Sequence, residues 1–346
     1  MNPAQSVDEA GSWAAGSLDG LTDPAVRDLA WLLSSPSLLR AQPPLAPLAT
    51  PWALAAEVRA TAQWLRELDR DPAPLHEVLD AGRPRQLGRY AELLLAWFLG
   101  HGPAARLVAA NVPLRQAGVT LGECDFLVEA SDGRRLHWEL AVKCYLHAGG
   151  PGARLADFVG PNLRDRFDRK RAHLLDHQLR LSEREAFLAL GHAGPWLAQM
   201  FVKGWLFYQA GASAKNGQGE PPELAPDHGR GWWVTHLDWP TFATQQGAAG
   251  WSVLPRVAWL APRRLAAGEP VRMEDEGAVT AAGMRYRATI AAPVDSDVLL
   301  EQLARREEPV MVAAFVSDGA GGYLEQSRGF IVPDDWPAHA QAFARD

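Results

Sequence analysis

The sequence predicts an α/β fold in which a helix, a β-hairpin, a second helix and a further strand follow one another between residues 81 and 210. Three observations predict it: a nearly uninterrupted apolar stretch of helical length, two strands with period-two alternation around a turn, and a later apolar stripe at helical spacing. The first helix is expected at residues 87–100, the strands at 123–128 and 136–145, the second helix at 161–181 and the last strand at 200–208.

Segments of different composition flank this core. Residues 1–80 are predicted to form a helical N-terminal extension, with Pro24 after Asp23 opening a helix. Residues 211–231 are rich in Gly, Pro and polar side chains, which predicts a loop or linker. Residues 232–346 are predicted to form a mixed α+β, tryptophan-rich region, within one large domain or as a second domain. Strands are expected there at 232–235, 257–260, 284–290, 310–316 and 330–332, with a hairpin turn at 318–322.

Composition and charge narrow the class of protein. With 47% hydrophobic and 22% charged residues, the chain is too apolar for intrinsic disorder, and most of its 14 tryptophans are expected in the core. No apolar run approaches the roughly 20 residues that a membrane helix needs. Two cysteines are too few for a disulfide framework and no secretory leader is evident, so a cytoplasmic location is expected. The net charge of -7 argues against sequence-independent coating of nucleic acid, so a surface that binds phosphate must be local.

Period-two alternation in the predicted hairpin separates a polar face from a core face. In the first strand Glu123 and Asp125 share one face, whereas Cys124 points to the other. In the second strand the polar face carries His137, Glu139, Ala141, Lys143 and Tyr145, and the apolar face carries Leu136, Trp138, Leu140, Val142 and Cys144. Acids and a lysine thus gather on one face of the hairpin, while both cysteines are expected to be inert packing thiols.

Asp125 and Glu139 can meet only if the hairpin has a suitable register. Facing residues must have numbers with an even sum, and a two-residue turn at Asp132-Gly133 gives an odd sum. That turn would send the two acids to opposite faces of the sheet. A shared site therefore predicts a three- or five-residue loop in this hairpin.

Carboxylates that converge at Asp125 and Glu139 repel each other unless a cation neutralises them. Hard oxygen ligands select Mg²⁺ or Mn²⁺ over softer metals. Such an ion polarises a phosphodiester oxygen and lowers the pKa of a bound water, and a nearby lysine, here Lys143, steadies the nucleophile. The pattern predicts a metal-dependent nuclease site, with a merely solvated polar sheet face as the alternative.

The pattern resembles the PD-(D/E)XK nuclease superfamily, in which a Gly-Glu-x-Asp strand precedes a strand bearing Glu-x-Lys. GECDFLV and HWELAVKCYL carry that resemblance. Together with LGRYAE, FVGPNLRDRFDRK, LLDHQL and GWLFY, they also make most of the chain look like a bacterial family of the domain-of-unknown-function type (DUF1853-like) that is grouped with those nucleases. The resemblance implies a restriction-endonuclease-like core, metal-binding roles for Asp125 and Glu139, a supporting acid at Glu92, and DNA as the substrate.

One position departs from the superfamily pattern. The residue two after Glu139 is Ala141, where the pattern has lysine. Lys143 lies two residues beyond that position, roughly 7 Å further at strand rise, and its flexible side chain recovers part of the offset. Lys170, on the following helix, is a weaker substitute. If neither lysine reaches the site, the protein would bind nucleic acid without cutting it.

Three other candidates have competing interpretations. Glu92 either supports the metal site or pairs with Arg89, three residues earlier on the same helix. Glu123 is either a third acid of the site or a rim residue paired with Lys143. His137 shares the polar face, but such a histidine is more often an ordinary strand residue than a ligand in a hard-metal site.

The helix expected at 161–181 carries a row of cations. Arg164, Arg169 and Lys170 are candidates for contacting a phosphate backbone, and a solvated helix with internal ion pairs explains the same residues equally well. The sequence therefore predicts a metal-dependent nuclease that acts on nucleic acid, with DNA the expected substrate. The alternative is a non-catalytic nucleic-acid-binding or scaffold protein with a degenerate nuclease fold.

Overall fold

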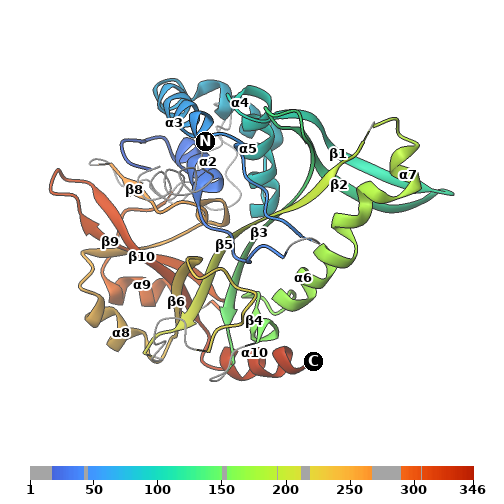
Figure 1. Ribbon diagram of the computed structural model, residues 1–346. Coiled ribbons are helices and arrows are strands. Elements are labelled where there is room, and N and C mark those ends of the chain that lie inside the picture. The colour runs from blue at the N-terminus through green and yellow to red at the C-terminus, as the bar shows by residue number, and fades with distance from the viewer. Residues whose placement is uncertain are drawn as a thin grey trace. The chain divides into compact units, whose positions relative to one another are not determined.

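A computed structural model describes residues 18–42, 46–149, 154–192, 194–211, 219–266, 290–304 and 306–346. It is a mixed α/β structure, as the sequence predicts, and its strands pair both parallel and antiparallel (Figure 1). The chain forms two compact units, each assembled from two stretches: Met1–Lys143 with Arg169–Gly204, and Cys144–Asp168 with Trp205–Asp346. Strands β3 (Arg135–His147) and β5 (Leu197–Gln209) contribute residues to both units.

The first unit begins with a set of helices, drawn blue to cyan in Figure 1: α2 (Pro24–Ser34), α3 (Ala55–Arg70), α4 (Ala73–Gly82) and α5 (Leu87–His101). The Asp23 side chain accepts the amide hydrogen bonds of Ala25 and Val26, which confirms the predicted helix start. Tyr90 of α5 donates a buried 2.8 Å hydrogen bond to Asp28 of α2, which ties the two helices together. No helix in the described ranges combines the length and apolarity needed to cross a bilayer.

The strands of the first unit follow the order β1-β2-β3-β5, with β1 at Arg106–Gln116 and β2 at Val119–Glu129. In the antiparallel β2–β3 hairpin Phe126 faces Trp138 and Leu127 faces His137, so facing residues have an even sum. Five residues, 130–134, connect the two strands. This confirms the loop length that a shared site for Asp125 and Glu139 requires.

Strand β1 is absent from the sequence-based expectation. Its sequence, RLVAANVPLRQ, lacks a clean alternation, and Pro113 cannot donate a backbone hydrogen bond. The strand lies at one end of the strand order and exposes much of its surface. The missing N–H of Pro113 therefore costs little free energy of folding there. This strand is not predicted because its sequence does not indicate that it lies at the edge of the sheet.

Strands β3 and β5 approach each other closely at a glycine. Gly204 has φ of 141°, and a Cβ atom there would collide with the carbonyl oxygen of Lys143. No side chain fits in that space, so glycine is required for β5 to run beside the strand that carries Glu139.

The second helix of the predicted core begins later than expected. Helix α6 spans Phe167–Asp176, and a 3₁₀ segment, η2 (Gln178–Glu183), and a short helix, α7 (Glu185–Leu188), follow it. Residues 161–166 are not helical, which corrects the expected start at Pro161. The Gly160 amide bonds to the Asp165 carbonyl, and Leu163 has φ of 51°, so a tight turn occupies this stretch.

The second unit contains the strand path β5-β6-β10-β9-β7, parallel from β5 to β10 and antiparallel beyond it. The strands predicted at 232–235, 310–316 and 330–332 are confirmed, and so is the hairpin turn at 318–322. The remaining elements are β4 (Phe158–Val159), β6 (Gly229–Thr235), α8 (Trp239–Gln246), β7 (Gly250–Val253), β8 (Arg264–Leu265), α9 (Ser296–Leu303), β9 (Val310–Ser317), β10 (Tyr323–Val332) and α10 (Trp336–Arg345).

The prediction of one strand in this unit is wrong, and another predicted strand lies largely outside the described residues. The segment expected as a strand at 257–260 contains a 3₁₀ turn, Arg256–Ala258, in which the Ala258 amide bonds to the Pro255 carbonyl. Pro255 presets its own φ and favours such a turn over an extended strand. The strand expected at 284–290 lies outside the described residues except for Ile290, which is in neither helix nor strand.

Tryptophans build the core of the second unit. Trp239 and Trp251 meet edge to face with ring centroids 4.6 Å apart, and Trp232 and Phe242 pack beside them. Every tryptophan in the described ranges is buried or half-buried. The prediction that tryptophans serve chiefly as core residues is confirmed for this part of the chain.

Candidate functional site

Asp125 lies where strand β2 stops pairing with β3. The backbone ladder between the two strands ends at Phe126 and Trp138. Beyond it, Oδ2 of Asp125 accepts a 2.8 Å hydrogen bond from the amide of Leu140, and the amide of Asp125 donates a 3.3 Å bond to Oε1 of Glu139. Side-chain carboxylates therefore replace the next backbone pairs, which brings both acids to one point between the strands.

This interruption also changes which residues share a face. On β1, Asn111 lies between the partners of Phe126 and Cys124 and has φ of 52°. The β1–β2 register is continuous across Asn111, so the change arises on the β3 side, where the side chain of Asp125 takes the place of a backbone pair. As a result Cys124, predicted to point away from the acids, has its sulfur within 4.8 Å of ligand atoms of His137 and Glu139. The expectation of a face separate from the acids is wrong for Cys124.

Glu139 is completely buried, and hydrogen bonds hold both of its oxygens. Nε2 of His137 lies 2.6 Å from Oε1, and Nε2 of Gln178 donates a 2.7 Å bond to Oε2. Each partner is itself supported. Nδ1 of His137 lies 3.0 Å from the hydroxyl of Ser182, and Nζ of Lys170 donates a 2.9 Å bond to Oε1 of Gln178. Two chains of hydrogen bonds therefore end on one carboxylate.

The 3₁₀ segment η2 supplies Gln178 and Ser182, and a glycine on β2 allows it to approach. Gly122 has φ of 155°, and a Cβ atom there would lie 3.0 Å from Leu181 and 3.1 Å from the ring of His177. Leu181 packs into the same apolar cluster as Cys124. Close packing of η2 on β2 covers the polar face of the hairpin, so that face is buried rather than solvated.

Burial dominates the electrostatics of the two acids. Burial and the neighbouring Glu139 raise the pKa of Asp125 from 3.8 to about 8, against the opposing effect of the Leu140 amide. Burial likewise raises the pKa of Glu139 from 4.5 to about 7, while hydrogen bonds from the Asp125 amide and the Asp125 side chain lower it. The carboxyl groups are thus near enough to share a hydrogen bond, and each resists ionisation beside the other.

Two groups from neighbouring helices act on this pair. The charge of Glu92 on α5 raises the pKa of Asp125, although Glu92 also forms a 2.9 Å ion pair with Arg89. Lys170 on α6 lowers the pKa of both Asp125 and Glu139. The predicted ion pair of Glu92 with Arg89 is therefore confirmed, a role of Glu92 in a metal site stays a prediction, and Lys170 is a cation that acts on both acids.

Lys143, the lysine favoured by the sequence, has a different setting. It is half-buried on β3 and is not among the main influences on the pKa of Asp125 or Glu139. Lys143 is four positions after Glu139 on the same strand, and each position adds about 3.3 Å along it. Lys170, approaching from a helix, avoids that separation.

The remaining candidates occupy the periphery. Glu123 is exposed, and its charge contributes to a raised pKa of Cys124. Arg169 is exposed on α6 in the first unit, and Arg164 is exposed in the second unit. Neither arginine is among the main influences on the pKa of Asp125 or Glu139.

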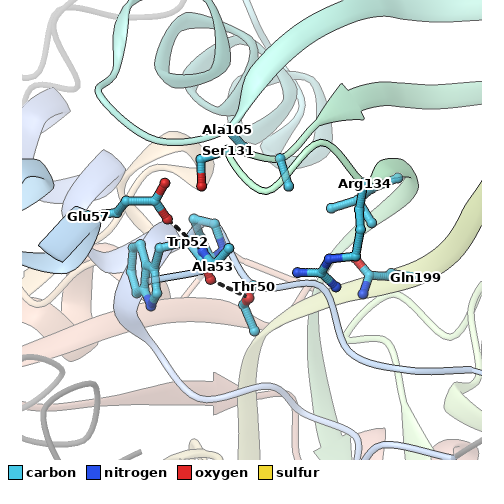
Figure 2. A pocket seen from close by; sticks show the side chains of 11 residues that line it. Thr50, Trp52, Ala53, Glu57, Ala105, Ser131, Arg134 and Gln199 are labelled. Carbon is cyan, nitrogen blue, oxygen red and sulfur yellow. Dashed lines mark hydrogen bonds between the residues drawn. The ribbon is translucent and has the colours of Figure 1, made fainter. Parts of the chain in front are cut away.

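A surface pocket of the first unit lies away from these acids. Its lining includes Glu57, Ser131, Arg134 and Gln199, beside the loop of the β2–β3 hairpin (Figure 2). Figure 2 shows the Glu57 carboxylate accepting a hydrogen bond from the backbone amide of Ala53, a contact that caps the start of α3. This acid therefore has a structural role, and neither Asp125 nor Glu139 lines the pocket.

Comparison with known proteins places the chain in a family. The model of the family described as a domain of unknown function, DUF1853, matches residues 27–332. The chain belongs to this family. The match runs from within α2 to the last residue of β10, so the DUF1853 region includes elements of both units. A search of curated proteins found no match, and neither did a search of solved structures.

Sequence reasoning missed three residues of this DUF1853 site: Cys124 as a neighbour of Glu139, and Gln178 and Ser182 as its supports. Gln178 and Ser182 are 39 and 43 positions after Glu139 and lie in what resembled the end of a single amphipathic helix. Cys124 and Gln178 fall in the motifs GECDFLV and LLDHQL of the family resemblance, but nothing local distinguishes Gln178 from a surface glutamine. The break of α6 before η2 turns both side chains toward β3.

Proposed function

We propose that the chain is a divalent-metal-dependent phosphodiesterase, a nuclease with a PD-(D/E)XK-type core that acts on DNA in the cytoplasm. One observation carries the proposal: the carboxyl groups of Asp125 and Glu139, on adjacent strands, meet in a buried setting with Lys170 acting on both. The order of α5, the β2–β3 hairpin, α6 and β5 supports it, because the superfamily core uses the same succession.

The donor set suits a hard divalent ion. Asp125 and Glu139 offer carboxylate oxygens, and Glu92 lies near enough to influence Asp125. Both carboxyl groups have pKa values raised by burial, and a cation bound between them would stabilise the ionised forms that burial disfavours. Mg²⁺ or Mn²⁺ would therefore be held by Asp125 and Glu139, and when bound it supplies a polarised phosphate oxygen and a more acidic water.

The protein side chains have separate tasks in this reaction. The Leu140 amide orients Asp125, and His137 and Gln178 orient Glu139, so that neither acid needs to reorganise. Lys170 carries the positive charge that steadies the attacking oxygen or the charge developing on the phosphate. Its hydrogen bond to Gln178 couples the position of that charge to the position of Glu139.

A non-catalytic nucleic-acid-binding protein is the second candidate. Ala141 occupies the position of the superfamily lysine, and both oxygens of Glu139 already have hydrogen-bond partners within the protein. A site of this kind would retain the fold and some metal affinity without turnover. The two candidates differ in cleavage and agree in metal uptake, so both properties need to be measured.

The experiment incubates the full chain with single- and double-stranded DNA and RNA in Mn²⁺ or Mg²⁺, and measures metal uptake in parallel. Asp125→Asn and Glu139→Gln should each lower cleavage by at least about 100-fold. Glu129→Gln, on the same strand as Asp125 but paired with Arg106 away from the site, is the matched control and should cleave normally. Turnover that survives Asp125→Asn and Glu139→Gln would remove the nuclease proposal, and metal uptake without turnover would favour the binding protein.

A further inference from the structure

Two side chains beside Glu139, Cys124 and His137, add donor atoms that a hard-metal site does not use. The sulfur of Cys124, a ring nitrogen of His137 and a carboxylate oxygen of Glu139 all lie within 4.8 Å of one another. All three residues are buried, with 0% exposure each. Sulfur, imidazole and carboxylate together are the ligand types of Zn²⁺, whereas Mg²⁺ and Ca²⁺ select oxygen alone.

We propose that Cys124, His137 and Glu139 form a cation site for a borderline-soft divalent ion such as Zn²⁺, which shares Glu139 with the proposed oxygen site. The site leaves the fourth tetrahedral position to a water molecule. It needs no nuclease activity, and it differs from the oxygen site of Asp125 and Glu139 in requiring the thiolate of Cys124.

The geometry is close to what such an ion requires. At metal–ligand distances of about 2.0–2.3 Å, tetrahedral ligands lie roughly 3.3–3.8 Å apart. The three ligand atoms all lie within 4.8 Å of one another, and Nε2 of His137 and Oε1 of Glu139, at 2.6 Å, are closer than two tetrahedral ligands. Sub-ångström to ångström movements of side chains suffice to accommodate the ion.

His137 already has the support typical of a metal-binding histidine. Its Nδ1 atom lies 3.0 Å from the hydroxyl of Ser182, which leaves Nε2 directed at Glu139. A hydroxyl both donates and accepts, so Ser182 can accept from Nδ1–H when the lone pair of Nε2 binds an ion. Burial lowers the pKa of His137 to about 4, and the ring therefore needs no deprotonation at neutral pH.

Charge balance also favours occupation of the site. A divalent ion with one thiolate, one carboxylate and one neutral imidazole has no net charge, which suits a fully buried position. The thiol of Cys124 is protonated without the ion, since burial and the nearby Glu139 raise its pKa. Binding breaks the S–H bond, forms a metal–sulfur bond and releases one proton to solvent.

Cobalt substitution tests the site directly, because a thiolate bound to Co²⁺ produces an ultraviolet charge-transfer band. The full chain is unfolded and refolded with Co²⁺, so that burial does not prevent loading. We expect one thiolate-bound Co²⁺ per chain, with loss of the band in Cys124→Ser and its retention in Cys144→Ser. Cys144 is the matched control, since the chain has only these two cysteines. No band in the unmodified protein, or a band that survives Cys124→Ser, would overturn the proposal.

A second measurement needs no variant, in case Cys124→Ser does not fold. X-ray absorption at the zinc edge of the Zn²⁺-loaded protein should show one sulfur among nitrogen and oxygen neighbours. A shell of oxygen and nitrogen alone would place the ion elsewhere and overturn the assignment. Neither readout involves cleavage, so failure of the proposed nuclease function leaves this test unaffected.

Discussion

Nε2 of His137 lies 2.6 Å from Oε1 of Glu139, and neither side chain has exposed surface. Burial lowers the pKa of His137 to about 4, so at neutral pH the ring is uncharged and carries one N–H. With that hydrogen on Nε2, the ring donates to Glu139 and accepts from Ser182 through Nδ1. The contact is therefore a hydrogen bond from an uncharged ring that orients the carboxyl group of Glu139, not an ion pair.

Removing His137 should lower the stability of the protein, because it leaves a buried acid without one of its hydrogen-bond partners. His137→Ala leaves Oε1 of Glu139 without its shortest side-chain partner, which should lower the free energy of unfolding by about 1–3 kcal/mol. Ser182→Ala removes only the outer link and should cost less. Urea denaturation of the metal-free proteins measures both, and equal losses in the two variants would contradict the expected hierarchy.

The two lysines should differ in their effect on cleavage. Lys170→Met removes the positive charge that acts on Asp125 and Glu139, and should lower Mn²⁺-dependent cleavage by about 100-fold without abolishing Mn²⁺ uptake. Lys143→Met should have a smaller effect. Single-turnover assays at saturating Mn²⁺ make the comparison. A larger loss with Lys143→Met would restore that lysine as the residue nearest the reaction.

Stability of the metal-free protein should fall as the pH rises from about 4 to about 8. The pKa values of Asp125 and Glu139 are raised to about 8 and about 7, so between these limits the folded protein holds protons that the unfolded chain releases. Their contribution is complete below the unfolded values near 4 and is lost through the folded values. At about 1.4 kcal/mol per pKa unit, the two shifts together set an upper limit on the order of 10 kcal/mol for this contribution.

Asp125→Asn provides the control for this pH dependence, because an amide does not titrate. Denaturation in a metal chelator should give a shallower fall in stability for this variant than for the unmodified protein. Parallel curves for the two proteins would show that the acid pair is not the origin. Addition of Mn²⁺ should stabilise the unmodified protein most at high pH, where the carboxylates are ionised.

Gly204 should tolerate no side chain. Gly204→Ala would drive a methyl group into the Lys143 carbonyl at φ of 141°, and should lower the free energy of unfolding by about 3 kcal/mol or more. Gly100→Ala, on α5 with no atom within 4 Å of the new Cβ, is the matched control and should change stability by about 1 kcal/mol or less. Thermal and urea denaturation decide, and an equal effect of both substitutions would contradict the close approach.

The exposed arginines of the α6 region should contribute to nucleic-acid affinity through charge. The double variant Arg164→Ala, Arg169→Ala should weaken binding similarly for all sequences, and should flatten the dependence of log K on log salt by about 0.9 for each phosphate that the protein no longer neutralises. Arg66→Ala with Arg70→Ala, on α3, is the charge-matched control. Fluorescence anisotropy across a salt series measures the slopes. Identical slopes for the two double variants would leave Arg164 and Arg169 as solvated surface residues.

The local sequence pattern predicts the helices and strands whose formation depends on neighbouring residues in the chain. Alternation predicts strands β2, β3 and β5, and the requirement that Asp125 and Glu139 share a site predicts the odd loop length that pairs Phe126 with Trp138. An apolar stretch predicts α5 nearly to its ends. The same local rules placed the start of α6 at Pro161, because they did not anticipate the turn held by the Gly160 amide and the Asp165 carbonyl.

In the candidate site, too, some contacts follow from the sequence and others depend on long-range packing. The sequence by itself determined that Asp125 and Glu139 would be close, since strand register follows from side-chain period and loop length. Only the tertiary structure decided that Lys170 lowers the pKa of both acids, and that Gln178 and Cys124 lie beside Glu139. Those contacts depend on η2 packing against Gly122 and on the interrupted ladder at Asp125, which are long-range events that no local period encodes.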